Sequence, residues 1–204
     1  MAVNFTPTTV AKPIGVQGSY PQREVPGHEG MIADLQAYVC RSYRNQSGAA
    51  VPFGAFVQTD TGSASNDPLA VKLAVTHTGI QGLVVSSMVF EGNALADMIY
   101  TPIPLPYAAD GRMGYPDKET VNVLSKGVVW VYTTAAVDLT DSVRFHKLDN
   151  TGTVAGAYIG RFTKTAITGK TVKCDYGARW LSKTGGAGLA LLEVDIPACT
   201  FTAD

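Results

Sequence analysis

Short stretches in which apolar and polar residues alternate recur along the chain, separated by turns rich in Asp, Asn, Gly and Ser. A period of two is that of a β-strand, because successive side chains of a strand point to opposite faces of the sheet. Connections such as TDTGSASNDP, LDNTGT and SKTGGAG have the residue types that form turns. Eight or nine short strands with this spacing predict an all-β fold, a jelly-roll-like β-sandwich. The expected strands are residues 33–45, 53–59, 69–75, 82–90, 120–134, 141–148, 155–163, 170–176 and 189–196.

The segment SKGVVWVYTTAAVDLTDSVRF, residues 125–145, has two apolar runs on either side of a polar corner. We expect it to form a β-hairpin. The two faces of its first run would be Val128, Trp130 and Tyr132, and Val129, Val131 and Thr133. Both faces are largely apolar, so at least one must be covered. Trp130 therefore lies either in the sandwich core or against a sister subunit.

The first thirty residues show no periodicity, and four prolines and four glycines interrupt residues 2–30. This pattern predicts an extended N-terminal arm, residues 1–30, ahead of a single sandwich domain, residues 31–204. Roughly twenty such residues would span about 65 Å when extended, which is enough to cross a neighbouring subunit. The N-terminus has no basic segment followed by an apolar one, so we expect no signal peptide.

A second proline-rich segment interrupts the strand pattern at residues 91–119. Proline cannot donate a hydrogen bond to a sheet, so we expect an excursion loop there and not a strand. Long ordered loops are usually functional, and this one has the Tyr, Met and Arg content typical of binding surfaces. The alternative is a loop that folds over its own sandwich.

The composition favours broad contact surfaces. Charged residues are 16% of the chain, below the roughly 25% usual for soluble domains, so much of the surface is neutral and costs little to desolvate. The net charge of -1 without a cluster of Lys and Arg argues against a nucleic-acid partner. The uncharged run at residues 73–90 is interrupted by polar residues too often for a membrane span.

The sequence has no motif for catalysis or for a cofactor. Cys40, Cys174 and Cys199 are odd in number and widely spaced, which favours free thiols over a disulfide framework or a metal site. The three histidines are isolated, and GKT at residues 169–171 lacks the earlier glycine of a phosphate-binding loop. We therefore expect no cofactor, no metal, no catalytic residue and no enzyme. The enzymatic alternative is a carboxylate pair for glycoside hydrolysis drawn from Asp97, Asp110, Asp117 and Glu119.

Several phrases of the sequence occur in an order that is similar to a known family. They are IADLQAYVCRSYRNQ, VPFGAFV, VLSKGVVWVY with AVDLTDSVRF, and AGAYIGRF. From about residue 15 to the end the chain resembles the capsid cement, or decoration, proteins of tailed bacteriophages. Where that family usually has a glycine beside the aspartate of the polar corner, this chain has Thr140 before Asp141. The resemblance implies a jelly-roll-like protein outside the icosahedral head that bridges neighbouring major capsid subunits.

We therefore expect a virion structural protein, made in the host cytoplasm, that stabilises the capsid from its outer surface. Its partners would be the major capsid protein and copies of itself, as a dimer or trimer, with no nucleic acid and no membrane. A carbohydrate-binding or adhesion module on the virion surface is the alternative. The expected partner-binding residues lie in the arm, the excursion loop and the apolar strand: Phe5, Val10, Ile14, Tyr20, Arg23, Tyr100, Tyr107, Arg112, Tyr115 and Trp130.

Overall fold

The computed structural model describes residues 27–61, 68–86 and 111–204, and these residues are almost entirely β, as the alternation predicted. Their helical content is one short 3-10 turn, η1 (Ile196–Ala198), and none of the described residues forms a helix that could cross a membrane. The strands are β1 (Ile32–Asn45), β2 (Val51–Pro52), β3 (Phe56–Thr59), β4 (Ala70–Leu73), β5 (Ile80–Val84), β6 (Gly114–Tyr115), β7 (Thr120–Thr133), β8 (Val143–His146), β9 (Phe162–Thr163), β10 (Thr171–Tyr176), β11 (Ala178–Trp180), β12 (Gly188–Asp195) and β13 (Thr200–Ala203).

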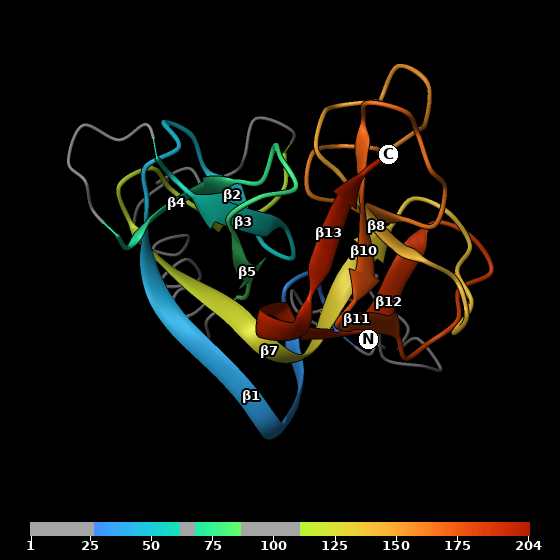
Figure 1. The fold of residues 1–204 in the computed structure, drawn as a ribbon, viewed down its shortest axis with the longest axis horizontal. Helices are drawn as coiled ribbons and strands as arrows, with labels where there is room; N and C mark the ends of the chain where they lie inside the picture. Colours follow the sequence, from blue (N-terminus) through green and yellow to red (C-terminus); the bar gives the residue numbers. More distant parts are fainter. Residues whose placement is uncertain (1–26, 62–67, 87–110) are drawn as a thin grey trace, which may run out of the picture.

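Eleven of these strands belong to one mixed sheet, and β2 pairs with β6 separately. The strands form two lobes, with β2 to β5 in one lobe and β8 to β13 in the other, and the long strands β1 and β7 run between them (Figure 1). In the first lobe the pairings β1–β4, β4–β3, β3–β5, β5–β7 and β7–β1 form a closed circuit. Closure leaves these strands with few unpaired edges.

Strand β7 contributes side chains to both hydrophobic cores. The smaller core lies in the first lobe, and the larger core lies mainly in the second. Val121 and Val123 face the smaller core, whereas Leu124, Val129 and Val131 face the larger one. In a regular strand Leu124 and Val129 would point to opposite faces, because they are five residues apart. A bulge between them brings both side chains to the same face of the strand. Val39 pairs with Lys126 and Cys40 with Leu124, so Ser125 is the extra residue on β7.

The two cores contain mostly aliphatic and aromatic residues from strands distant in sequence. The members of the smaller core include Val51, Phe53, Val57, Val71, Val84, Tyr115, Val121 and Val123. Those of the larger core include Phe56, Leu83, Leu124, Val129, Val131, Phe145, Phe162, Val172, Cys174, Trp180 and Leu192.

The predicted hairpin at residues 125–145 is wrong. Both strands exist, as β7 and β8, but they do not pair with each other, because β9 lies between them. Thr133 pairs with Phe162 in parallel, and Phe162 in turn pairs with Phe145. The polar corner is a turn in which the backbone N–H of Asp141 donates to the carbonyl of Asp138 at 3.0 Å. Nine residues separate β7 from β8, so the connection is long enough to admit another strand.

Two further segments differ from expectation. The strand expected at residues 155–163 is reduced to β9, because Gly156 and Gly160 have φ of 74° and 84° and place turns ahead of it. Part of the expected excursion loop contributes β6, while residues 91–110 lie outside the described residues.

Gly82 permits the close approach of β5 to β7. A Cβ atom at Gly82 would lie 2.2 Å from the carbonyl oxygen of Leu124, and backbone atoms cannot move aside as a flexible side chain would. We predict that Gly82→Ala lowers the free energy of unfolding by about 1–3 kcal/mol, the usual cost of overpacking. Urea unfolding of the purified chain measures this loss.

The matched control is Gly185→Ala, because a Cβ atom at this exposed position would meet nothing within 4 Å. Its effect should stay within about 0.5 kcal/mol. Equal unfolding midpoints for the two variants would show that the β5–β7 approach is not tightly packed.

Candidate interaction site

Most of the predicted partner-binding residues belong to parts of the chain that the structure does not describe. Three of them lie within the described residues: Arg112, Tyr115 and Trp130. The other seven lie outside the described residues: Phe5, Val10, Ile14, Tyr20, Arg23, Tyr100 and Tyr107. Whether any of the ten contacts a partner stays a prediction.

Trp130 lies on the outer face of β7 and is half-buried, whereas its neighbours Val129 and Val131 are fully buried. Its cover comes from Gly27, where a Cβ atom would lie 2.4 Å from Cδ1 of the indole. The backbone N–H of Gly30 donates to the carbonyl of Trp130, and the N–H of Trp130 donates to the carbonyl of Met31, both at 2.8 Å. The tryptophan of the larger core is Trp180, which is 1% exposed.

Arg112 is also engaged within the chain. Its side chain is 7% exposed, and Nη1 lies 3.6 Å from Oε1 of Glu29. Nη2 donates to the carbonyl of Ile159 at 2.6 Å, and the guanidinium lies over the ring of Tyr158 at 5.8 Å from its centroid.

A second arginine, Arg161, lies on the other side of Glu29, and the sequence reasoning missed it. Its Nη2 lies 3.8 Å from Oε2 of Glu29. Its guanidinium lies 4.0 Å from the ring centroid of Tyr132 and 5.4 Å from that of Tyr158, distances typical of cation–π contacts. Two arginines thus flank one carboxylate whose side chain is 18% exposed, and their guanidinium groups lie over Tyr132 and Tyr158.

Tyr115 serves the smaller core. It is 4% exposed, its ring meets that of Phe53 edge-on with centroids 5.3 Å apart, and its hydroxyl donates to the carbonyl of Val85 at 2.9 Å. In this chain Tyr115 is therefore a packing residue with a satisfied hydroxyl.

Arg112, Trp130 and the residues around them fasten the short segment Gly27–Gly30, which we call the arm root because it is the last part of the predicted arm. The backbone N–H of Ser86 donates to the carbonyl of Gly30 at 2.9 Å, and His28 Nε2 lies 2.9 Å from the Ser86 hydroxyl. Gly30 has φ of 84°, and a Cβ atom there would lie 2.7 Å from Cβ of Phe53. The root is thus held by backbone, ionic and aromatic contacts together, and these contacts fix the point at which residues 1–26 join the body.

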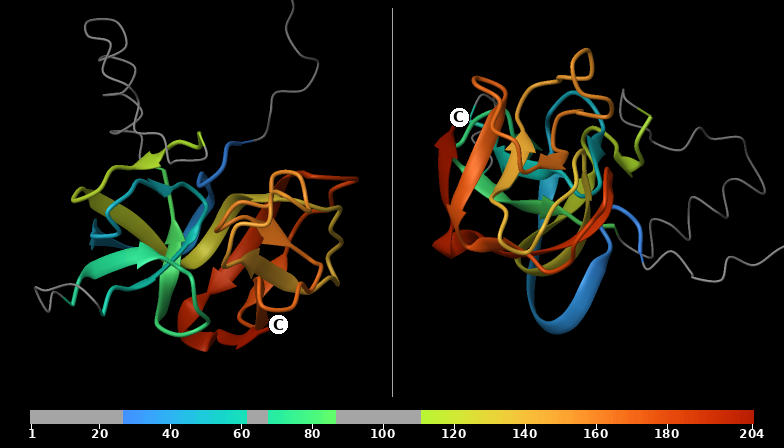
Figure 2. Two further views of the ribbon diagram at one scale, coloured as in Figure 1. Left: turned by 90° about the horizontal axis from the view of Figure 1, so that it is seen from above. Right: turned by 90° about the vertical axis from the view of Figure 1, so that its right-hand side faces the viewer.

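Next to the root, β1 bends away from the sheet. Asp34 pairs with Val128 and Val39 pairs with Lys126, so five steps along β1 match two steps along β7. We call the outward segment, residues 34–39, the β1 arch; it protrudes in Figure 1 and in the right view of Figure 2. Tyr38 and Val39 on the arch are 45% and 41% exposed. An exposed aromatic and an exposed aliphatic residue on a protruding strand are typical of a contact surface.

A surface hollow of about 470 Å³ adjoins the foot of the arch. Charged residues of both signs line it, namely Asp34, Lys126, Arg179, Glu193 and Asp195. The pKa of Lys126 is raised because its ammonium donates a hydrogen bond to Asp195 at 2.8 Å. Arg179 similarly donates to Glu193. The charges of the hollow are largely balanced in pairs, so it offers hydrogen bonds without a strong field.

Across residues 27–61, 68–86 and 111–204, no three His, Cys, Asp or Glu side chains gather as a metal site would require. The arch is an apolar protrusion, the hollow carries paired surface charges, and the root fixes the point at which the chain enters the body. Together these features suit contact with another molecule.

Comparisons with known proteins agree with this picture. A chain of "The capsid of Myoviridae Phage XM1" has a similar fold, with a TM-score of 0.54 at 17% identity, over 88% of this chain and 97% of that one. A family described as "Structural cement protein (E217 gp24/Pam3 gp6)" matches residues 16–195. No curated protein matches significantly. The chain therefore belongs to this family of structural cement proteins of phage capsids, which confirms the resemblance and gives it a structural role in the virion.

The arm root generates a stability prediction. Replacing Glu29 by Gln removes the carboxylate between Arg112, which is buried, and Arg161, whose side chain is 15% exposed, and an uncompensated buried charge costs about 3 kcal/mol or more. We expect Glu29→Gln to lower the free energy of unfolding by on the order of 3 kcal/mol in guanidinium titrations.

The control is Glu193→Gln, which breaks the ion pair with Arg179, whose side chain is 71% exposed. Such exposed pairs contribute under about 1 kcal/mol. If the two variants lost the same stability, the ionic cluster would not be what holds the root.

Proposed function

We propose that this protein binds the outer surface of the phage head and stabilises it by bridging neighbouring major capsid subunits. Membership of the structural cement family supports a capsid-stabilising role. The observation that carries the finer proposal is the arm root. A chain segment that leaves the body from a point fixed by Glu29 and Trp130 can transmit tension between the body and a distant contact.

Residues 1–26 have the length that bridging needs. An extended chain rises by at most about 3.3 Å per residue, so twenty-six residues reach about 85 Å. Their sequence, with four apolar or aromatic candidates in Phe5, Val10, Ile14 and Tyr20, suits burial in grooves between capsid subunits. In this proposal the arm binds one subunit while the body binds another.

The second contact of the proposal is the β1 arch with its exposed Tyr38 and Val39. Tyrosine adds a large contact area with little loss of conformational entropy. Burial contributes roughly 25 cal/mol per Å² before association costs are subtracted, so either contact alone would bind modestly. Two contacts on a fixed lattice raise the overall affinity by about 10² to 10⁴-fold through effective concentration.

Self-association is part of the same proposal. A dimer or trimer would multiply the number of arms that one particle site engages, and the low charge density of the chain, 16% charged residues, keeps the desolvation cost of such contacts small. The molar mass of the purified protein by light scattering distinguishes monomer, dimer and trimer.

The experiment compares heads that carry the full-length protein, a variant lacking residues 1–26, or the double variant Tyr38→Ala with Val39→Thr. We expect both variants to fold but to occupy heads at least about tenfold less than the full chain at equal concentration. Heads decorated by the variants should release DNA at lower temperature. Occupancy and thermal release are measured on the same particles.

The matched control is Leu148→Ala, because Leu148 is 46% exposed, much like Tyr38, but lies outside the arch and the root. It should decorate heads as the original chain does. Full occupancy by the arm-deleted chain would refute bridging by the arm, and full occupancy by the arch variant would place the body contact elsewhere.

A further inference from the structure

Two of the three cysteines lie side by side, although they are 25 residues apart in the sequence. Cys174 is on β10, inside the larger core and 4% exposed. Cys199 ends η1, immediately before β13, and is half-buried beside exposed neighbours. The Sγ atoms are 3.4 Å apart, and all three cysteines are free thiols.

The surroundings of the pair hold the two sulfurs together. The backbone N–H of Cys199 donates to the carbonyl of Ile196 at 2.9 Å, and a Cβ atom on Gly177 would lie 2.7 Å from Cys199 Sγ. The Sγ atom of Cys174 also lies 2.8 Å from the carbonyl oxygen of Tyr176. A disulfide needs an S–S separation of about 2.05 Å. The two sulfurs, 3.4 Å apart, would have to approach each other to form the bond.

We propose that Cys174 and Cys199 form an oxidation site, at which a small-molecule disulfide converts the two thiols into an intrachain disulfide that fastens β13 to β10. The thiolate of Cys199 attacks one sulfur of the reagent and releases one thiol. The thiolate of Cys174 then attacks Cys199 Sγ in the mixed disulfide and releases the second thiol. Two protein thiols are oxidised and one reagent disulfide is reduced to two thiols, so atoms and electrons balance.

The environment favours this order of attack. The thiol of Cys174 donates a hydrogen bond to Cys199, which lowers the pKa of Cys199 and raises that of Cys174. The thiolate is the reactive form of cysteine, and the sulfur with the lower pKa is also the more exposed of the two. Cys40 differs, since burial raises its pKa.

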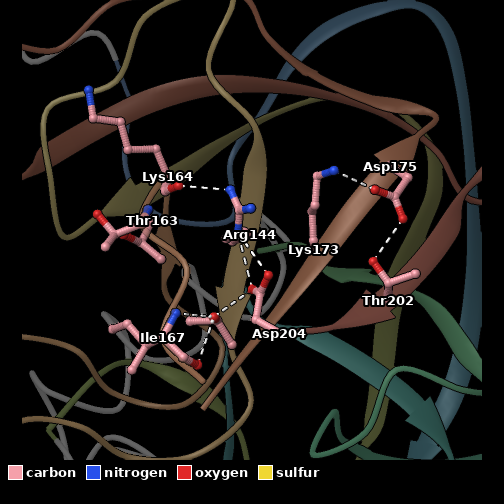
Figure 3. Close-up of polar contacts among 10 residues, drawn as sticks. Arg144, Thr163, Lys164, Ile167, Lys173, Asp175, Thr202 and Asp204 are labelled. Atoms are coloured by element: carbon pink, nitrogen blue, oxygen red, sulfur yellow. Dashed lines mark hydrogen bonds and ion pairs between the residues drawn. The ribbon is translucent and has the colours of Figure 1, made fainter. Parts of the chain in front are cut away.

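The disulfide would add a covalent anchor to the C-terminal strand, which lies at the edge of the sheet. Among the described strands, β13 pairs with β10 only and ends the sheet. Its far end is clamped, because Arg144 Nε lies 3.1 Å from Asp204 Oδ2 and the Thr171 hydroxyl donates to Asp204 at 2.6 Å. Thr202 donates to Asp175 at 2.8 Å in the middle of the strand (Figure 3). A bond at Cys199 would add a covalent link at the near end of the strand.

The redox conditions around the protein decide whether such a disulfide persists. Disulfides are rare in a reducing cytosol and persist at virion surfaces. A bond formed after particle release would stabilise the strand at the stage when a virion needs it. This timing rests on the proposed outer-surface location, whereas the reactivity of the pair does not.

The test uses the isolated full-length chain, so its result is independent of head binding. The reduced protein is incubated with glutathione disulfide, alkylated, digested and analysed by mass spectrometry. We expect peptides with Cys174 and Cys199 to be linked, two hydrogens lighter than the reduced pair, while Cys40 is alkylated. The melting temperature should rise by roughly 6–12 °C and return on reduction.

Cys40→Ala is the matched control and should behave as the original chain, whereas Cys199→Ala should form no intrachain bond and gain no thermal stability. The proposal is overturned if both thiols stay open to alkylation after oxidation, if the bond forms through Cys40 or between chains, or if the linked form melts no higher than the reduced one.

Discussion

The packing of this protein depends on one strand serving two hydrophobic cores. β7 runs through both lobes, with Val121 and Val123 in the smaller core and Val129 and Val131 in the larger. This arrangement requires a change of face within the strand, which the bulge at Ser125 provides. Gly127 lies beside it with φ of 140°, and a Cβ atom there would come within 3.0 Å of Tyr38 Cβ. The bulge therefore joins the two cores and also lets β1 arch outward on the other side.

The functional features follow from the same strand. The outer face of β7 presents Trp130 and Tyr132, and these side chains hold the arm root through Gly27 and Arg161. The chain has few charged residues, and three of them contact one another internally: Glu29 lies between Arg112 and Arg161. Within residues 27–61, 68–86 and 111–204, the arch and the balanced hollow are the surfaces that our proposal assigns to a partner. Internal contacts at the root together with exposed residues on the arch suit a structural cement protein.

The sequence was informative where a property is local. Alternation identified most strands and sorted residues 128–133 into two faces, but only the structure shows that Val129, Val131 and Thr133 face inward. Pairing between distant strands was not predictable, and so the hairpin prediction failed once β9 entered between β7 and β8. The ionic cluster joins Glu29, Arg112 and Arg161 across more than a hundred residues, and no spacing rule reports such a contact. The local signal that could have identified the root is the stretch GHEG, residues 27–30, in which two glycines flank the single carboxylate of Glu29.

In the proposed function, the chain before Gly27 leaves a fixed root and reaches capsid subunits other than the one beneath the body. A density map of the intact particle at side-chain resolution tests this most directly. It should show residues 1–26 extended over a neighbouring major capsid subunit, with the β1 arch against the subunit below. A map in which those residues fold back on their own sandwich, or in which the protein lies inside the shell, would contradict it.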